Sequence, residues 1–176
     1  MGFTTGSLNL NYSANANKNN GASGETSLRE SVSLSYANKL ASGDGANKAE
    51  ANWSQDIAIL TSESGIIDLT GGVGATTGVV IGCVNGFGDD IVFTRLKQIV
   101  IVNDSDSNVS LSMTSGVDDL GLTTTGGLIL PGSGTVALSH PNSGYVVVTN
   151  TSDKITFKNA SAGTVNFSIY LTGSTS

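Results

Sequence analysis

The segment TVNFSIYLT, residues 164–172, decides the fold class of this chain. Its apolar side chains occupy every second position from Val165 to Leu171, so they fall on one face of an extended strand. The segment KITFKN, residues 154–159, has the same period of two, and the joining sequence NASAG is short enough for a hairpin loop. We therefore predict that the chain ends in two strands joined as a β-hairpin.

Similar segments recur throughout the chain from Trp53 onward, rich in Val, Ile, Thr, Phe and Tyr and separated by turn sequences such as DSDS, PGSG and HPNSG. Strands that recur every ~8–12 residues with turns between them are typical of an antiparallel sandwich or barrel. The segment LKQIVIVN, residues 96–103, is almost continuously apolar, which predicts a central strand covered on both faces. We therefore predict an all-β fold for residues 51–176: an antiparallel β-sandwich, jelly-roll-like, with little helix.

The first 50 residues have a different composition, rich in Asn, Ser, Ala and Gly. Such stretches bury too little apolar surface to offset the entropy that they lose on ordering by themselves. Apolar and polar residues nevertheless alternate in LNLNY (8–12) and, less strictly, in LRESVSLSY (28–36), as expected of strands with one buried face. We predict an extended N-terminal arm over residues 1–50, with short strand segments that order against the body or a neighbour. A disordered tail is the alternative interpretation.

Trp53, the only tryptophan, lies where the polar arm meets the β-rich body. A tryptophan ring buries a large area for little lost freedom, so this residue is suited to anchor the arm on the body or on a partner. A place at the edge of the sandwich core is the other interpretation. Together with the apolar positions of the arm, it makes up the predicted partner-binding set: Leu28, Val32, Leu34, Tyr36 and Trp53.

The charge balance excludes several classes of protein. Eight Lys and Arg residues against fourteen Asp and Glu give a net charge of −6, and 12% of the residues are charged. Eight scattered cations do not make the stripe that a nucleic-acid-binding protein needs to neutralise phosphates.

No apolar run approaches the ~20 residues of a membrane span, and the start MGFTTGSLNL lacks the layout of a secretion signal. We expect no nucleic-acid partner, no membrane association and no export through a signal peptide.

Few residues are suited to catalysis or metal binding. The single cysteine, Cys83, lies in the apolar run VVIGC, and the single histidine, His140, lies in the turn-like sequence SHPNSG. They are too few for a zinc site, which needs ~3–4 such ligands, and they do not identify a catalytic triad. The segment Asp104–Asn108 is similar to the start of a calcium loop, but Val109 and Ser115 stand where that loop needs Gly and Glu. We predict no catalytic residue, no metal, no cofactor and no enzymatic activity.

Residues 36–176 contain a succession of motifs: YANKLASGDGANKAEANW (36–53), GIIDLTGG (65–72), FTRLKQIVIVN (93–103), LILPGSGTVALSHPNSGYVVVTNTSDKITFKN (128–159) and VNFSIYLTG (165–173). This succession resembles small virion structural proteins of tailed phages. In these, an arm with K-L-A-S-G-x-G precedes an Asp-Leu strand, an R-x-K-x-I strand, a P-G-G-type turn and a final strand ending in Gly. The sequence PGSG departs from the usual double glycine. The resemblance implies a capsid decoration (cement) protein or a related head or tail accessory, and it brings no catalytic residue with it.

From this resemblance and the arm-plus-body division we expect a virion structural protein on the capsid surface, made in the host cytoplasm. Its expected partners are the major capsid protein, which it would bind and stabilise through the arm, and further copies of itself, with a trimer favoured over a dimer. The alternative is a head-fibre or tail accessory domain that recognises a cell-surface glycan. Sandwiches commonly bind sugars through exposed aromatic and polar side chains, and Tyr36, Tyr145 and Tyr170 are available for this.

Overall fold

The computed structural model describes residues 5–18, 28–71, 79–106, 111–115, 128–149, 151 and 153–176. Within these ranges the side chains are described from Leu40 onward, apart from those of residues 111–115. The chain forms two compact units: Ser7–Lys39, which we call the ribbon, and a unit containing Leu40–Ser176, which we call the body. The described part of the chain contains no helix, and therefore none long and apolar enough to cross a membrane.

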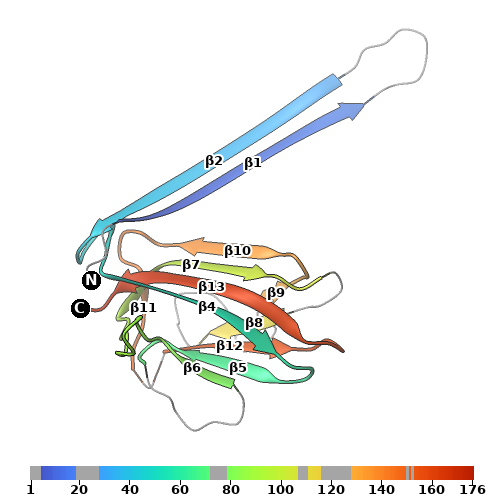
Figure 1. Ribbon diagram of the computed structural model, residues 1–176. Coiled ribbons are helices and arrows are strands. Elements are labelled where there is room, and N and C mark those ends of the chain that lie inside the picture. The colour runs from blue at the N-terminus through green and yellow to red at the C-terminus, as the bar shows by residue number, and fades with distance from the viewer. Residues whose placement is uncertain are drawn as a thin grey trace, which may run out of the picture. The chain divides into compact units, whose positions relative to one another are not determined.

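The ribbon contains most of two long strands, β1 (Thr5–Lys18) and β2 (Leu28–Ser42), which pair with each other in opposite directions (Figure 1). They have 14 and 15 residues, and are longer than the short strand segments expected from the two alternating stretches. The odd-numbered positions of β1 are all Thr, Ser or Asn, so the period of two continues beyond its last large apolar residue, Tyr12. The last two residues of β2 pair in parallel with the short strand β3 (Lys48–Ala49).

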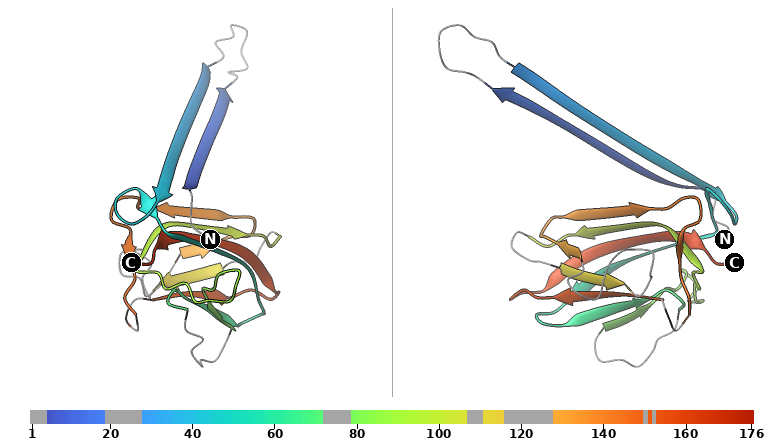
Figure 2. Two further views of the ribbon diagram at one scale, coloured as in Figure 1. Left: turned by 60° about the vertical axis from the view of Figure 1, so that its left-hand side comes forward. Right: turned by 180° about the vertical axis from the view of Figure 1, so that it is seen from behind.

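The body contains two five-stranded sheets, which form separate layers (Figure 2). The first sheet has the order β10-β7-β13-β4, with β11 also paired to β7, and the second has the order β6-β5-β12-β8-β9. Neighbouring strands within these two sheets are antiparallel except for β5 and β6. The strands are β4 (Ala51–Ile59), β5 (Ser64–Asp68), β6 (Val79–Gly82), β7 (Arg95–Asn103), β8 (Leu111–Ser115), β9 (Leu128–Leu130), β10 (Thr135–Ser139), β11 (Tyr145–Val146), β12 (Lys154–Asn159) and β13 (Val165–Ser174).

The strand pairs of the body are nested in one another. Strand β4 pairs with β13, β5 with β12, β7 with β10 and β8 with β9, so the pairs close from the ends of the body toward its middle. The pairs belong alternately to the first and the second sheet. The body is therefore one long antiparallel hairpin that crosses repeatedly from one sheet to the other. The prediction of an all-β fold for this part of the chain is confirmed.

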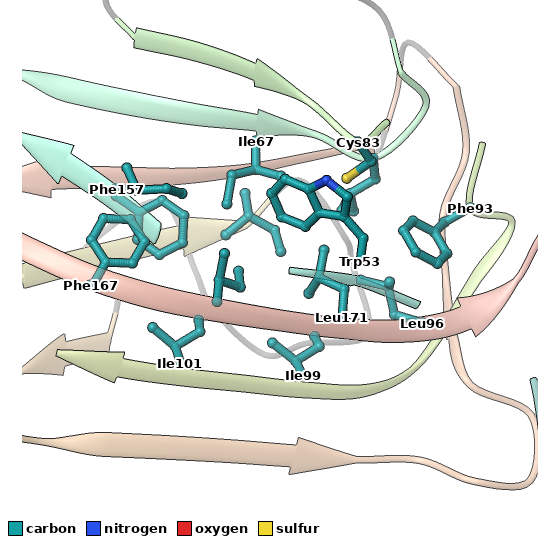
Figure 3. Close-up of a cluster of buried hydrophobic side chains, with 14 of the residues drawn as sticks. Trp53, Ile67, Cys83, Phe93, Leu96, Ile99, Ile101, Phe157, Phe167 and Leu171 are labelled. Carbon is teal, nitrogen blue, oxygen red and sulfur yellow. The ribbon is translucent and has the colours of Figure 1, made fainter. Parts of the chain in front are cut away.

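Inward-facing side chains of both sheets meet in a single hydrophobic core (Figure 3). The rings of Phe157 in the second sheet and Phe167 in the first lie 4.5 Å apart between centroids. Ile67 and Leu171, also from opposite sheets, are each 1% exposed. Because full burial of such a side chain contributes ~1.5–3 kcal/mol, this core supplies the main stabilising free energy of the body.

Two strand predictions have different outcomes. The segment 96–103 is the central strand β7, paired with β10 on one side and β13 on the other, as predicted. The expected cover on both faces is wrong, because Val100 and Val102 on the outward face are partly exposed. The predicted C-terminal hairpin is wrong, because β12 and β13 belong to different sheets. At the end of β12 the buried side-chain amide of Asn159 donates to Ile59 O at 3.0 Å and to Gly163 O at 2.6 Å. These bonds fix residues 160–164 as a connection between the two sheets. The alternation of apolar and polar residues in the flanking strands is the same for such a connection as for a hairpin, so the sequence pattern did not distinguish the two.

Gly173 is the point of closest approach between β13 and β7. The strand register shifts between Thr172 and Gly173, where β7 inserts the extra residue Lys97. A Cβ atom at residue 173 would overlap the carbonyl oxygen of Arg95 and would lie 2.9 Å from the ring of Phe93. A side chain at this position therefore requires the two strands to move apart.

Gly173→Ala is expected to lower the free energy of unfolding by ~1–3 kcal/mol, because the added methyl group overpacks this contact. Urea unfolding of the full-length protein measures the change. Gly163→Ala is the matched control, since a Cβ atom there meets nothing within 4 Å, and it should change the stability by less than ~0.5 kcal/mol. Equal effects of the two substitutions would contradict the close approach.

Candidate functional site at the root of the ribbon

The segment Leu40–Glu50, which we call the root, connects the ribbon to β4. It folds back on itself, and the amide of Ala41 donates to Asn47 O at 2.9 Å. Asn47 has a φ of 57°, a left-handed conformation that asparagine tolerates better than most residues. Leu40 and Ala49 are fully buried. The root is therefore part of the compact unit of the body, although it lies within the arm predicted over residues 1–50.

Main-chain hydrogen bonds attach the root to two distant parts of the body. The amide of Asn47 donates to Pro141 O at 2.8 Å, in the turn between β10 and β11. The amide of Glu50 donates to Gly173 O at 2.9 Å, near the end of β13. The chain that leaves the ribbon is therefore fixed before it enters the first sheet.

Lys97 reinforces the first of these attachments, although its side chain is only 1% exposed. Its Nζ atom donates to Asn142 O at 2.6 Å and to Gly45 O at 3.3 Å, so one ammonium group joins the turn and the root. Burial lowers the pKa of Lys97 from its usual value, and the nearby charge of Arg95 lowers it further. A buried cation is tolerated only where such polar partners replace water.

Glu50 holds the end of the chain against the root. One of its carboxylate oxygens, Oε2, accepts hydrogen bonds from the amide and hydroxyl of Thr175 at 2.9 and 3.1 Å, and from those of Ser176 at 3.1 and 2.8 Å. The bond from the Thr175 amide, followed by that from the Ser176 hydroxyl, lowers the pKa of Glu50. Hydrogen bonds of this kind stabilise the charged form of a carboxylate.

The predicted partner-binding residues are divided between the ribbon and the core. Leu28, Val32, Leu34 and Tyr36 lie in β2, and their side chains lie outside the described part of the structure. Trp53 lies in the core, 6% exposed, with its indole ring among Ile67, Cys83 and Leu171 (Figure 3). The structure therefore places Trp53 in the core, which is the second of the two positions considered from the sequence.

The loop Asn85–Asp89 presents an exposed aromatic residue that the sequence analysis did not single out. Phe87 is 79% exposed at the tip of this loop. The side-chain oxygen of Asn85 accepts hydrogen bonds from the amides of Phe87 at 2.8 Å and Asp89 at 3.0 Å. Gly88 has a φ of 90°, which glycine adopts without strain. The ring is therefore displayed on a turn that its own hydrogen bonds organise.

The acidic segment after β7 is hydrogen-bonded to Asn166 and Ser168 of β13. The Ser168 hydroxyl lies 2.6 Å from Asp104 Oδ2 and 2.8 Å from Asp56 Oδ1. Asn108, the last residue of the calcium-like segment, lies outside the described residues. Within the described ranges, no group of three or more His, Cys, Asp or Glu side chains is arranged to hold a metal ion.

The surroundings of His140 and Cys83 give both residues a structural role. The His140 ring packs edge-on against Tyr145 with centroids 5.4 Å apart, and the amide of Gly144 donates to its Nδ1 atom at 3.3 Å. These contacts span at most five residues and stabilise the turn after β10. Cys83 is fully buried, and this burial, with a smaller contribution from Asp68, raises the pKa of its thiol to about 12.

Lys97 and Phe87 have signals in the local sequence, although neither is among the predicted site residues. Lys97 is a charged residue within the mainly apolar segment LKQIVIVN, where burial requires polar partners. Phe87 stands between two glycines in NGFGD, a turn sequence with an aromatic residue at its tip. The contacts of Glu50 have no such local signal, because its partners are 125 and 126 residues away.

Glu50→Gln is expected to reduce the stability at neutral pH, because a neutral amide accepts these four hydrogen bonds more weakly than a carboxylate. The lowered pKa of Glu50 means that its contribution is present above the usual value of 4.5 and is lost as the pH falls through the pKa of the folded state. The difference in melting temperature between wild type and variant should therefore shrink on acidification. Glu63→Gln, an exposed glutamate in the β4–β5 turn, is the control, and a constant difference for Glu50→Gln at all pH values would contradict the assignment.

No protein-family model matches this chain, and comparison with curated proteins finds no relative.

Proposed function

We propose that this chain is a phage virion structural protein: a capsid decoration protein that binds the major capsid protein shell and stabilises it. In this proposal the ribbon is the binding arm and the body is a rigid subunit on the outside of the particle. The protein is made in the host cytoplasm, acts as a homo-oligomer, with a trimer favoured over a dimer, and has no enzymatic role. The observation that carries the proposal is the long two-stranded ribbon attached to an ordered root.

A two-stranded ribbon is at best marginally stable by itself in water, because two strands cannot enclose a core. Strands β1 and β2 have 14 and 15 residues and form a compact unit separate from that of the body. Such a ribbon gains stability when it packs on another surface or adds to the edge of another sheet. A binding arm that orders on a capsid meets this requirement.

The strand order of the body supports a jelly-roll-like β-sandwich as the finer description of the fold. The nested pairs β4–β13, β5–β12, β7–β10 and β8–β9 divide eight strands between two sheets of four, as in a jelly roll. On this description β6 and β11 are additions at the edges. Jelly rolls occur in viral capsid proteins and in lectins, so the fold is compatible with the proposal but does not select it.

The net charge and the small fraction of charged residues also support a place on the particle exterior. The chain has a net charge of −6 and only 12% charged residues. A negative protein is repelled by packaged DNA. A surface of mainly uncharged polar residues allows identical copies to stand close together without strong mutual repulsion.

Deletion of residues 1–39 is expected to abolish binding to capsids assembled without this protein, because it removes the arm. The cut precedes Leu40, which is buried in the body, so the truncated chain should retain a cooperative thermal transition. Co-sedimentation with capsids measures binding, and Lys39→Ala in the full-length chain is the control for a change at the cut. Full binding by the truncated body would contradict the arm mechanism.

A glycan-binding head-fibre or tail accessory domain is the second candidate function, and Phe87 favours it. Exposed aromatic rings on organised loops are suited to stack on sugars, and Tyr170 is also 49% exposed. On this alternative, a glycan array should give hits that Phe87→Ser removes while leaving the melting temperature unchanged. An array without hits, together with hundreds of copies per particle by quantitative mass spectrometry, would exclude the alternative in favour of decoration.

A further inference from the structure

The outward face of the first sheet carries an apolar row across three strands. Ala137 of β10 is the direct partner of Val100 in β7, and Val100 is the direct partner of Tyr170 in β13. Directly opposite residues project from the same face of a sheet. Tyr170 is 49% exposed, and Val100 and Ala137 are partly exposed. This row, Ala137–Val100–Tyr170, is an apolar strip on a surface that is otherwise mainly polar.

A negative site adjoins the strip in the next row of the same sheet. Ser168 is the direct partner of both Val102 and Asp56, and its hydroxyl contacts the carboxylates of Asp56 and Asp104 at 2.8 and 2.6 Å. A hydroxyl group has one proton, so it can donate to one of these carboxylates at a time. Two exposed carboxylates with a single shared donor attract a cationic side chain.

The sequence of the ribbon provides a complementary surface. Even-numbered positions include Leu8, Leu10 and Tyr12 in β1 and Leu28, Val32, Leu34 and Tyr36 in β2. Leu40 continues this series at the end of β2, and it is fully buried in the body. Lys18, the last residue of β1, has the same parity. Each strand therefore presents an apolar face, and that of β1 ends in a cation.

Strands β1 and β2 and the rest of the chain have net charges of opposite sign. Strands β1 and β2 contain Lys18, Arg29 and Lys39 against one acid, Glu30, which gives +2. The whole chain has a net charge of −6, so the remainder carries −8. Opposite net charges favour association and guide its orientation.

From these features we infer that the apolar face of β2 in the ribbon of one copy packs across the Ala137–Val100–Tyr170 strip of a second copy, with Lys18 of β1 near Asp56 and Asp104. This inference rests on the proposed role of the ribbon as an arm, and it names the surface that receives the arm. The 15 residues of β2 span ~50 Å, against ~33 Å for the 10 residues of β13. A ribbon of this length exceeds the sheet of a single body and has the reach to cross between neighbours. One arm and one receiving face per copy allow a closed ring.

Disulfide trapping tests this inference with full-length protein. Leu34→Cys and Tyr170→Cys are introduced into separate chains with different mass tags, which are then co-expressed. Cys83 is buried, so it can remain in place. Mild oxidation should give a disulfide-linked heterodimer. Two pairings are controls and should give at least fivefold less product: Ser33→Cys, of opposite parity, with Tyr170→Cys, and Leu34→Cys with Ile129→Cys, an exposed position of β9 in the second sheet.

Further variants separate a second copy from other occupants of the strip. Equal trapping by Ser33→Cys and Leu34→Cys, or no heterodimer at all, would overturn the inference. So would a disulfide that forms within a single chain carrying both Leu34→Cys and Tyr170→Cys when the mixed chains give none. In sedimentation experiments, Tyr170→Ser and Lys18→Glu should each weaken self-association at least tenfold, whereas Ile129→Ser should not.

The outcome is independent of the capsid-binding experiment. If the cysteine variants form the expected disulfide but the protein does not bind capsids, the exchanged-arm oligomer is supported and the decoration role is overturned. If the protein binds capsids but the expected disulfide does not form, the decoration role is supported and the proposed receiving face is overturned.

Discussion

The pairing of β4 with β13 is the interaction on which the rest of the body depends. It runs from Ile59 opposite Val165 to Ala51 opposite Gly173, and it joins the first and last long strands of the body. Because the strands are antiparallel, the chain that arrives from the ribbon lies beside the chain that leaves β13. This geometry allows Glu50 to bind Thr175 and Ser176. The same pairing closes the outermost level of the nested hairpin and brings Trp53 opposite Leu171.

Buried polar side chains stabilise the places where the chain changes direction or sheet. Asn103 ends β7, and its amide donates to Leu130 O at 3.1 Å and to Pro131 O at 2.9 Å. Asn159 does the same at the end of β12, and Lys97 joins the root to a turn. A buried polar group without a partner costs ~1–3 kcal/mol, so such residues favour one loop arrangement over others. The apolar core holds the sheets together, and these groups select how the strands are connected.

The organisation of the molecule separates stability from recognition. The body has its own core, an ordered root and a set of nested strand pairs, and the described residues that form them all lie from Leu40 onward. The ribbon has the alternation of a strand with one buried face, but two strands cannot cover that face by themselves. In the proposed function, the ribbon is the part that binds other subunits. Phe87 is a separate exposed aromatic residue on the body.

The sequence by itself determined that the chain is built of strands, which residues of β12 and β13 face inward and that segment 96–103 is central, because the period of two is a local property of an extended chain. The alternation of apolar and polar residues in KITFKN and TVNFSIYLT is the same for a hairpin and for a crossing between sheets. Only the tertiary structure decided that β12 and β13 belong to different sheets. The burial of Trp53, the clamp formed by Lys97 and the bonds of Glu50 were likewise decided by tertiary structure. Each depends on partners more than forty residues away, and a local pattern contains no information about such partners.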